Sequence, residues 1–381
     1  MASIETARAL GAEIGERSQE IESGRRLPLD LVDTLATADL FRLCVPRSLG
    51  GPEVDVQTLV DILETIAVAD GSAAWCVMIG STSALLSAYL PIEVAREIYQ
   101  PKTISGGVFA PLGRALATSD GYRVSGRWPF ASGCQHCSWL MGGCVVLEDG
   151  KPQLLGNGLP DVRLMLVPAS EATILDTWDV AGLRGTGSHD IEIQEVFVPR
   201  HRAVSLITDL PREDGPLYRF PAFGLLALGI SAVALGIARR AMTELHELSM
   251  VKTPTGSRRR LGERAAIQTD VAQSQAKLAA ARALLRQTIA DVWQAASDGA
   301  PLTLDQRAAL RLAATHATST SAEVVDRMYH AGGGSAVYSR SPLQRCFRDI
   351  HVATQHVMVA SPTYELVGRV LLGLDADPAQ L

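Results

Sequence analysis

The 381-residue chain is poor in aromatic residues (5%), has six cysteines, and carries a net charge of only −6. Six cysteines spread unevenly over such a length do not form a disulfide framework, so we expect reduced thiols and a cytoplasmic protein. The small negative charge gives no reason to expect nucleic acid or an anionic membrane as a partner. The first residues form neither a basic nor an apolar segment, so no secretory signal is predicted.

Several common catalytic motifs are also missing. The chain has no Walker-type phosphate loop, no G-x-S-x-G elbow, no H-E-x-x-H motif and no G-x-G-x-x-G between a strand and a helix. We therefore do not expect it to hold NAD in a Rossmann site. Cys134 and Cys137 have the spacing of metal ligands, with His136 between them, but no second ligand pair follows. Structural thiols are predicted there, and no metal.

One long apolar run, residues 220–238, contains no charged residue and approaches the length of about 20 residues that a membrane span needs. Three glycines, Gly224, Gly229 and Gly236, and repeated alanines would instead let a core helix pack closely against its neighbours. Because no other segment resembles a span, we predict a buried helix and no membrane partner.

The order of secondary structure along the chain is helical, then β, then helical again. Helical patterns at 4–21, 29–38, 54–68 and 72–89 predict an N-terminal helical domain over residues 1–101. Short β-rich segments at 103–109, 121–128, 138–147, 162–167, 173–178 and 190–198 predict a small antiparallel β-barrel or sandwich over 102–211. Long helical stretches at 220–249, 261–297, 304–331 and 343–372 predict a C-terminal four-helix bundle over 212–381. The predicted fold class is mainly α with a central β domain.

Four motifs stand in this framework. The predicted β domain contains GYRVSG followed by WPFASG (121–133), then WDVAGLRGTGS (178–188). The predicted bundle contains RRRLG (258–262) and YHAGGGSAVY (329–338). With the helix–β–helix order, these motifs resemble the acyl-CoA dehydrogenase superfamily over nearly the whole chain, and the resemblance implies an acyl-CoA dehydrogenase-like fold.

The resemblance also implies which residues hold a flavin. Phe130 takes the place of an aromatic residue on the flavin face, and Ser132 that of a hydroxyl near flavin N5. The second motif contributes Arg184, either a structural guanidinium or a flavin contact, and Thr186. Arg258 corresponds to an arginine that reaches the pyrophosphate. Gly333, Gly334 and Ser335 correspond to a turn that meets the adenine end of a neighbouring subunit's FAD.

The segment 348–357 departs from the dehydrogenase pattern. Counting from Asp349, His356 falls on the family's tyrosine and Val357 on the glutamate that acts as base. Valine cannot abstract a proton, and Glu365 lies two helical turns further on. On one continuous helix His351 and His356 would point about 140° apart, so they should not share a site. The run Ser132-Gly133-Cys134-x-His136-x-x-Trp139 and the late histidine-rich segment resemble instead the two-component (group D) flavin monooxygenase branch.

That branch implies an oxygenase that takes reduced flavin from a separate NAD(P)H-flavin reductase and forms a C4a-hydroperoxide with O2 in a dry pocket. FAD is the expected cofactor, with FMN as the alternative. His356 is the expected catalytic histidine, with Ser132, while His136 is either a pocket residue or a strand-end hydrogen bond. The helix at 75–83 offers only hydroxyl side chains where aromatic hydroxylases of this branch often carry a histidine. This argues against a phenolic substrate and leaves indoles, polyketide aromatics and the oxidation of a heteroatom open, within an expected small aromatic or heteroaromatic substrate.

Two other functions remain open from the sequence: an acyl-CoA dehydrogenase-type FAD oxidoreductase, and a non-catalytic binding or assembly protein on the same fold. The resemblance of the glycine-rich turn implies a homo-oligomer, a tetramer before a dimer, with flavin at the interface.

Overall fold

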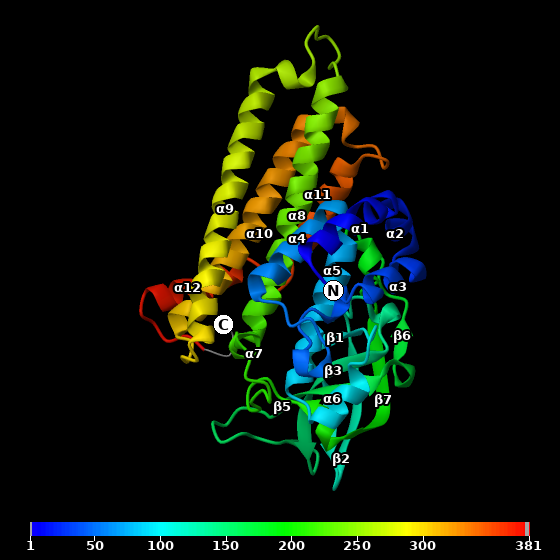
Figure 1. Cartoon of the computed structure of the whole chain (residues 1–381), viewed down its shortest axis with the longest axis vertical. Helices are drawn as coiled ribbons and strands as arrows, with labels where there is room; N and C mark the ends of the chain where they lie inside the picture. The colour runs from blue at the N-terminus through cyan, green and yellow to red at the C-terminus, as the bar shows by residue number, and fades with distance from the viewer. Residues whose placement is uncertain (1, 378–380) are drawn as a thin grey trace.

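The computed structural model describes residues 2–377 and residue 381 of the chain. Figure 1 shows an elongated molecule with a β domain at one end and long helices extending away from it, while the N-terminal helices lie alongside their junction. The acyl-CoA dehydrogenase-like arrangement of helical domain, β domain and helical bundle follows this order along the chain.

The N-terminal region contains α1 (Ile4–Glu16), α2 (Ser18–Gly24), α3 (Leu29–Thr37), α4 (Val56–Ala69), α5 (Gly71–Ser83) and α6 (Ile92–Ile98). Asp70 alone separates α4 from α5, and its carboxylate caps α5 by accepting from the backbone N–H of Ala73 at 2.9 Å. Every residue of α5 except Ile79 is buried. This helix therefore runs through the interior, where its side chains reach both the sheet and the bundle.

The described part of the β domain forms one sheet with the strand order β6-β7-β2-β1-β3-β5-β8, and β4 pairs with β3. The strands are β1 (Ser105–Ala117), β2 (Gly121–Trp128), β3 (Trp139–Glu148), β4 (Lys151–Pro152), β5 (Val162–Pro168), β6 (Thr173–Leu175), β7 (Asp190–Pro199) and β8 (Ala203–Val204). The expectation of a purely antiparallel barrel or sandwich is wrong in one pair, because β1 and β3 are parallel. The β1–β2 hairpin occupies one side of β1, and the chain then returns to the starting end of β1 before β3 pairs on its other side. β1 also continues to Ala117, beyond the expected end at 109, through register shifts around Pro111.

Trp128, at the end of β2, is completely buried in the sheet, where its Nε1–H donates to the Gly143 carbonyl at 2.8 Å. The indole lies against glycines of the neighbouring strands. A Cβ atom added at Gly113 or Gly142 would come within 2.2 or 2.5 Å of this ring. These positions must therefore be glycine if the indole is to lie flat inside the sheet.

The bundle contains α7 (Pro216–Arg219), α8 (Ala222–Val251), α9 (Ala265–Ser297), α10 (Leu304–Gly332), α11 (Pro342–Ala353) and α12 (Pro362–Leu371). Among the described residues, two helical segments, Gly71–Ala88 and Ala222–Val251, are long and apolar enough to cross a membrane, but 94% and 83% of their windows are buried inside the protein. The prediction that the run 220–238 forms a buried helix is confirmed.

The fourth predicted bundle helix, 343–372, is not continuous. α11 ends at Ala353 and α12 begins at Pro362. Pro362 stands in the first turn of α12, where a proline is tolerated because its missing N–H has no partner within the helix, so it marks the start of a new helix. His356 therefore lies in the α11–α12 connection, and the argument that it points about 140° away from His351 on one helix is wrong.

Candidate active site

Trp75, in the buried helix α5, joins two of the predicted site residues. Its indole Nε1–H donates to Ser132 Oγ at 3.1 Å, and its ring centroid lies 5.8 Å from that of His356. Ser132 comes from the segment after β2, and His356 from the α11–α12 connection. The structure thus brings side chains from all three regions of the chain to one point. No local pattern in the sequence indicates this role for Trp75, because 57 residues separate it from Ser132.

Ser132 belongs to a chain of buried hydroxyl groups. Its Oγ lies 2.7 Å from Ser188 Oγ, and Ser188 Oγ lies 2.7 Å from Thr186 Oγ1. Thr186 Oγ1 donates to the Leu183 carbonyl at 2.8 Å. All three hydroxyl residues are 5% exposed or less. The first and second β-domain motifs, which are far apart in the sequence, therefore meet through these side chains.

Phe130 has the opposite character, because its side chain is 68% exposed. Its backbone lies in the left-handed region (φ 66°), which is uncommon for a bulky residue, and the ring meets Trp178 edge to face at 6.1 Å. An exposed, strained aromatic residue beside a buried hydroxyl network is typical of a functional site.

His356 is half-buried, and burial, helped by the positive charge of Arg311, lowers its pKa to about 4. The imidazole is therefore neutral at neutral pH. Its Nδ1 accepts from the backbone N–H of Met358 at 3.2 Å, so Nε2 carries the ring proton. In this form His356 offers a hydrogen-bond donor.

His136 lies in the short 3-10 turn after Ser132. Its Nε2 is 3.1 Å from the Leu27 carbonyl and must donate to it. Its Nδ1 is buried without a hydrogen-bond partner in the described structure, and burial lowers the pKa of the ring to about 4. His136 and Ser132 line the same small cavity, together with Ser105 and Cys137. His136 was expected to be either a pocket residue or a hydrogen-bonding residue at a strand end. Its hydrogen bond to Leu27 is present and connects the turn to the α2–α3 loop.

The loop that carries Arg184 and Thr186 is fixed to the bundle. Asp349 in α11 is buried, and its Oδ1 accepts from the backbone N–H of Leu183 at 2.6 Å. Burial raises the pKa of Asp349 to about 7. Arg184 is half-buried and donates to the Val180 carbonyl at 2.8 Å, so its guanidinium holds the shape of its own loop.

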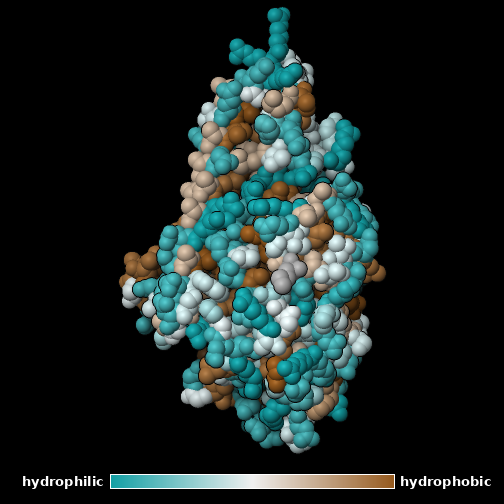
Figure 2. Space-filling view, viewed as in Figure 1, coloured by the Kyte–Doolittle hydropathy of each residue, from teal (hydrophilic) through white to brown (hydrophobic). Residues whose placement is uncertain are grey.

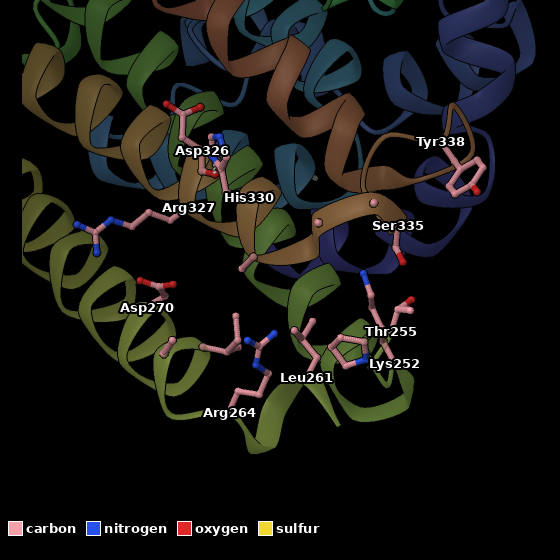
Figure 3. Close-up of a pocket in the computed structure, with 16 residues that line it drawn as sticks. Lys252, Thr255, Leu261, Arg264, Asp270, Asp326, Arg327, His330, Ser335 and Tyr338 are labelled. Carbon is pink, nitrogen blue, oxygen red and sulfur yellow. Dashed lines mark hydrogen bonds between the residues drawn. The ribbon is translucent and has the colours of Figure 1, made fainter. Parts of the chain in front are cut away.

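The glycine-rich turn lies elsewhere, at the end of α10, and borders a groove of about 870 Å³. Figure 3 shows Lys252, Arg264 and Arg327 around this groove, with Lys252 pointing toward the turn, where it donates to the Gly332 carbonyl at 2.6 Å. Gly333, Gly334 and Ser335 line the groove, and Gly333 has φ 54°. Arg258 is exposed on the α8–α9 connection and lies outside the described residues that line the groove.

The groove and the Trp75 contacts occupy different parts of the chain. Figure 1 shows the α8–α9 connection and the end of α10 at the far end of the bundle from the β domain. The predicted flavin residues therefore fall into two groups: Phe130, Ser132, Arg184 and Thr186 near the sheet, and Gly333, Gly334 and Ser335 at the groove, with Arg258 nearby.

Comparisons with known proteins agree with this architecture. Residues 2–106 match the acyl-CoA dehydrogenase N-terminal domain, and residues 228–361 match the acyl-CoA dehydrogenase C-terminal domain. Indole-3-acetate monooxygenase of Pseudomonas putida is 33% identical over 96% of this chain and 92% of its own. The chain belongs to the flavin-dependent monooxygenases of the acyl-CoA dehydrogenase superfamily.

Other members of the family are similar over most of their length. The oxygenase subunit HsaA of a flavin-dependent monooxygenase from Mycobacterium tuberculosis is 30% identical over 90% of this chain and 88% of its own. The structure of XiaF from Streptomyces sp. in complex with FADH2 and glycerol superimposes with a TM-score of 0.89 at 28% identity, covering 98% of this chain and 95% of that one. The predictions of fold, enzyme class and reduced-flavin cofactor are confirmed: this monooxygenase is an oxidoreductase that uses reduced flavin and O2. The non-catalytic alternative is wrong.

Proposed function

We propose that this monooxygenase oxygenates a small aromatic or heteroaromatic substrate of the indole type, at the site formed by Phe130, Ser132, Trp75 and His356. The observation that carries the proposal is the convergence of Ser132 and His356 on one buried indole. Relatives whose names specify indole-3-acetate as substrate, from Pseudomonas putida and Acinetobacter baumannii, support an indole-type substrate.

The side chains present fit a flavin. The exposed ring of Phe130 offers an apolar face to a planar group, and Ser132 Oγ keeps a lone pair beyond its bonds to Trp75 and Ser188. When bound, a reduced flavin supplies the electrons that activate dioxygen. A separate NAD(P)H-flavin reductase is the proposed source, since relatives are named oxygenase subunits or components.

In this proposal each side chain has one task. Phe130 positions the ring system, and Ser132 contacts its N5 edge. Neutral His356 uses Nε2–H to hold an oxygen atom of the substrate or of the oxygen being transferred. His136 keeps the Ser132 turn against Leu27, because its one ring proton is already used there. A dehydrogenase would need a carboxylate base at position 357, but this position holds Val357, which is 72% exposed and cannot accept a proton.

FAD is the proposed flavin, because the groove beside the glycine-rich turn is lined by Lys252, Arg264 and Arg327, whose positive charges suit a second phosphate. A homo-oligomer, a tetramer before a dimer, would bring this groove to a neighbouring subunit's flavin. Exposed leucines at the end of α12 support such an assembly, since Leu371, Leu372 and Leu374 are 73%, 76% and 51% exposed. Figure 2 shows apolar residues at the edge of the molecule where α12 lies. The proposed location is the cytoplasm.

The first test mixes anaerobic protein carrying one equivalent of reduced FAD with oxygenated buffer, with and without indole as the probe substrate. We expect an absorbance distinct from reduced and oxidised flavin before oxidised flavin returns, and an indole product that contains one atom of ¹⁸O from ¹⁸O2. Direct reoxidation without an oxygenated product would contradict the proposal that an indole-type substrate is oxygenated at this site.

A further inference from the structure

Four buried groups form an unbroken hydrogen-bond series: Trp75 Nε1, Ser132 Oγ, Ser188 Oγ and Thr186 Oγ1. The series ends on the Leu183 carbonyl. Trp75 is 6% exposed and Ser188 is 4% exposed, so water does not compete for their hydrogen bonds. We call this series the hydroxyl relay.

The direction of the relay follows from counting protons. A carbonyl oxygen only accepts, so the Thr186 hydroxyl donates its one proton to the Leu183 carbonyl. Thr186 Oγ1 then accepts from Ser188, whose single proton is used in turn, so Ser188 Oγ accepts from Ser132. The indole N–H at the other end only donates, and it donates to Ser132. The Thr186 end alone sets the direction, because Ser132 Oγ has two lone pairs and can accept from the indole N–H wherever its own proton points.

This direction decides what Ser132 can do next. Its proton points at Ser188, away from any ligand, and what remains free on Ser132 Oγ is a lone pair. Ser132 is therefore an acceptor and not a donor. The N5 atom of a reduced flavin carries a proton and donates, whereas the N5 atom of an oxidised flavin accepts.

We infer that Ser188 and Thr186 are positioning residues that fix Ser132 as an acceptor, so that the site favours reduced over oxidised flavin. The inference rests on the proposed function, in which Ser132 contacts the N5 edge. Reversing the relay would turn the Thr186 proton away from Leu183, and the hydroxyl and carbonyl oxygens would then face each other at 2.8 Å without a proton between them. The protein thus opposes the hydrogen bond that oxidised flavin needs.

The test measures anaerobic dissociation constants for oxidised FAD and dithionite-reduced FAD, and their ratio, in wild type and variants. Ser188→Ala frees the Ser132 proton to donate to oxidised N5, and we expect the oxidised-to-reduced ratio to fall about five- to tenfold. Thr186→Val, nearly isosteric, should lower the ratio in the same way, and Thr186→Ser should restore it. The midpoint potential of the bound flavin should fall along with the ratio.

Two further variants check the direction itself. Trp75→Phe removes the donor but leaves Ser132 donating to Ser188, so the ratio should not fall. Ser231→Ala, a buried serine that bonds only its own helix at the Leu228 carbonyl (2.8 Å), is the matched control and should leave the ratio unchanged.

The outcomes separate this inference from the function on which it rests. Wild type that binds neither form of FAD would overturn both. Wild type that binds FAD, with an unchanged ratio in Ser188→Ala and Thr186→Val, overturns the inference alone. An equal fall in Trp75→Phe would also overturn the inference, because the ratio would then depend on the packing around Ser132 and not on where its proton points.

Discussion

The contacts around Trp75 and the glycine-rich groove were both predicted for one cofactor, yet they are built in opposite ways. The Trp75 site is assembled from segments far apart in the chain, held by buried neutral hydrogen bonds. The groove is open and charged, and its lining comes from the ends of neighbouring helices. The difference teaches that the region assigned to chemistry is held by its own buried hydrogen bonds, whereas the region assigned to the nucleotide end offers mainly an open surface with charged side chains.

The largest effect is expected from His356→Ala, which removes the proposed donor from the Trp75 site. Oxygenated product per flavin oxidised should fall about 100-fold or more, because a positioned proton donor contributes on that scale. His201→Ala, an exposed histidine in the β domain, is the matched control. Undiminished product yield in His356→Ala, measured against ¹⁸O2, would remove His356 from the mechanism.

A second variant tests whether the Trp75 site depends on the bundle. Asp349→Ala leaves the buried Leu183 N–H without its acceptor and should lower the free energy of unfolding by about 1–3 kcal/mol. Asp349→Asn keeps an acceptor oxygen and should lose less. Urea unfolding measures both, and equal losses in the two variants would contradict a hydrogen-bond role.

The pH dependence of the free energy of unfolding should come from the buried and half-buried titratable groups near Trp75, namely His356, His136 and Asp349. His356 and His136 have folded pKa values near 4, below their ordinary value of 6.5, so the unfolded chain takes up these protons first as pH falls. Their contribution to stability is complete above pH 6.5 and is lost between pH 6.5 and 4. Asp349, with its pKa raised to about 7, acts in the opposite direction, since its contribution is lost as pH rises from about 4 to 7.

Double substitution of His356→Gln and His136→Gln should therefore flatten or reverse the acid side of the stability profile, measured by thermal unfolding between pH 4 and 7. A profile as steep as that of wild type would mean that other groups take up the protons.

The smallest effect is expected at the groove. Arg264→Ala should weaken FAD binding about two- to fivefold at low salt, because an exposed charge pair contributes little. FMN, which lacks the second phosphate and adenine, should be unaffected. Arg258→Ala is the comparison variant, and a larger loss for it than for Arg264→Ala would favour the assignment made from the sequence.

The sequence was most informative where structure is local. β2 was predicted at 121–128 and is observed at Gly121–Trp128, and α10, predicted at 304–331, runs from Leu304 to Gly332. The break between α11 and α12 was not predicted, because the helical periodicity of 343–372 gives no sign of the end at Ala353 and Pro362 marks only the start of α12. The bonds from Trp75 to Ser132 and from Leu183 to Asp349, across 57 and 166 residues, depend on tertiary packing that no periodicity contains.

The buried ring of Trp128 fixes the position of the end of β2 within the β domain. Its indole fills a slot between strands whose glycines leave no spare volume, so the end of β2 cannot slide in or out. Phe130 and Ser132 follow two and four residues later in the chain, so the buried Trp128 ring limits where they can lie relative to the sheet. Trp128 thus sets the position of Phe130 and Ser132 although its own hydrogen bond goes to Gly143. A larger residue at Gly142 would push the Trp128 ring away and so displace both site residues without changing their side chains.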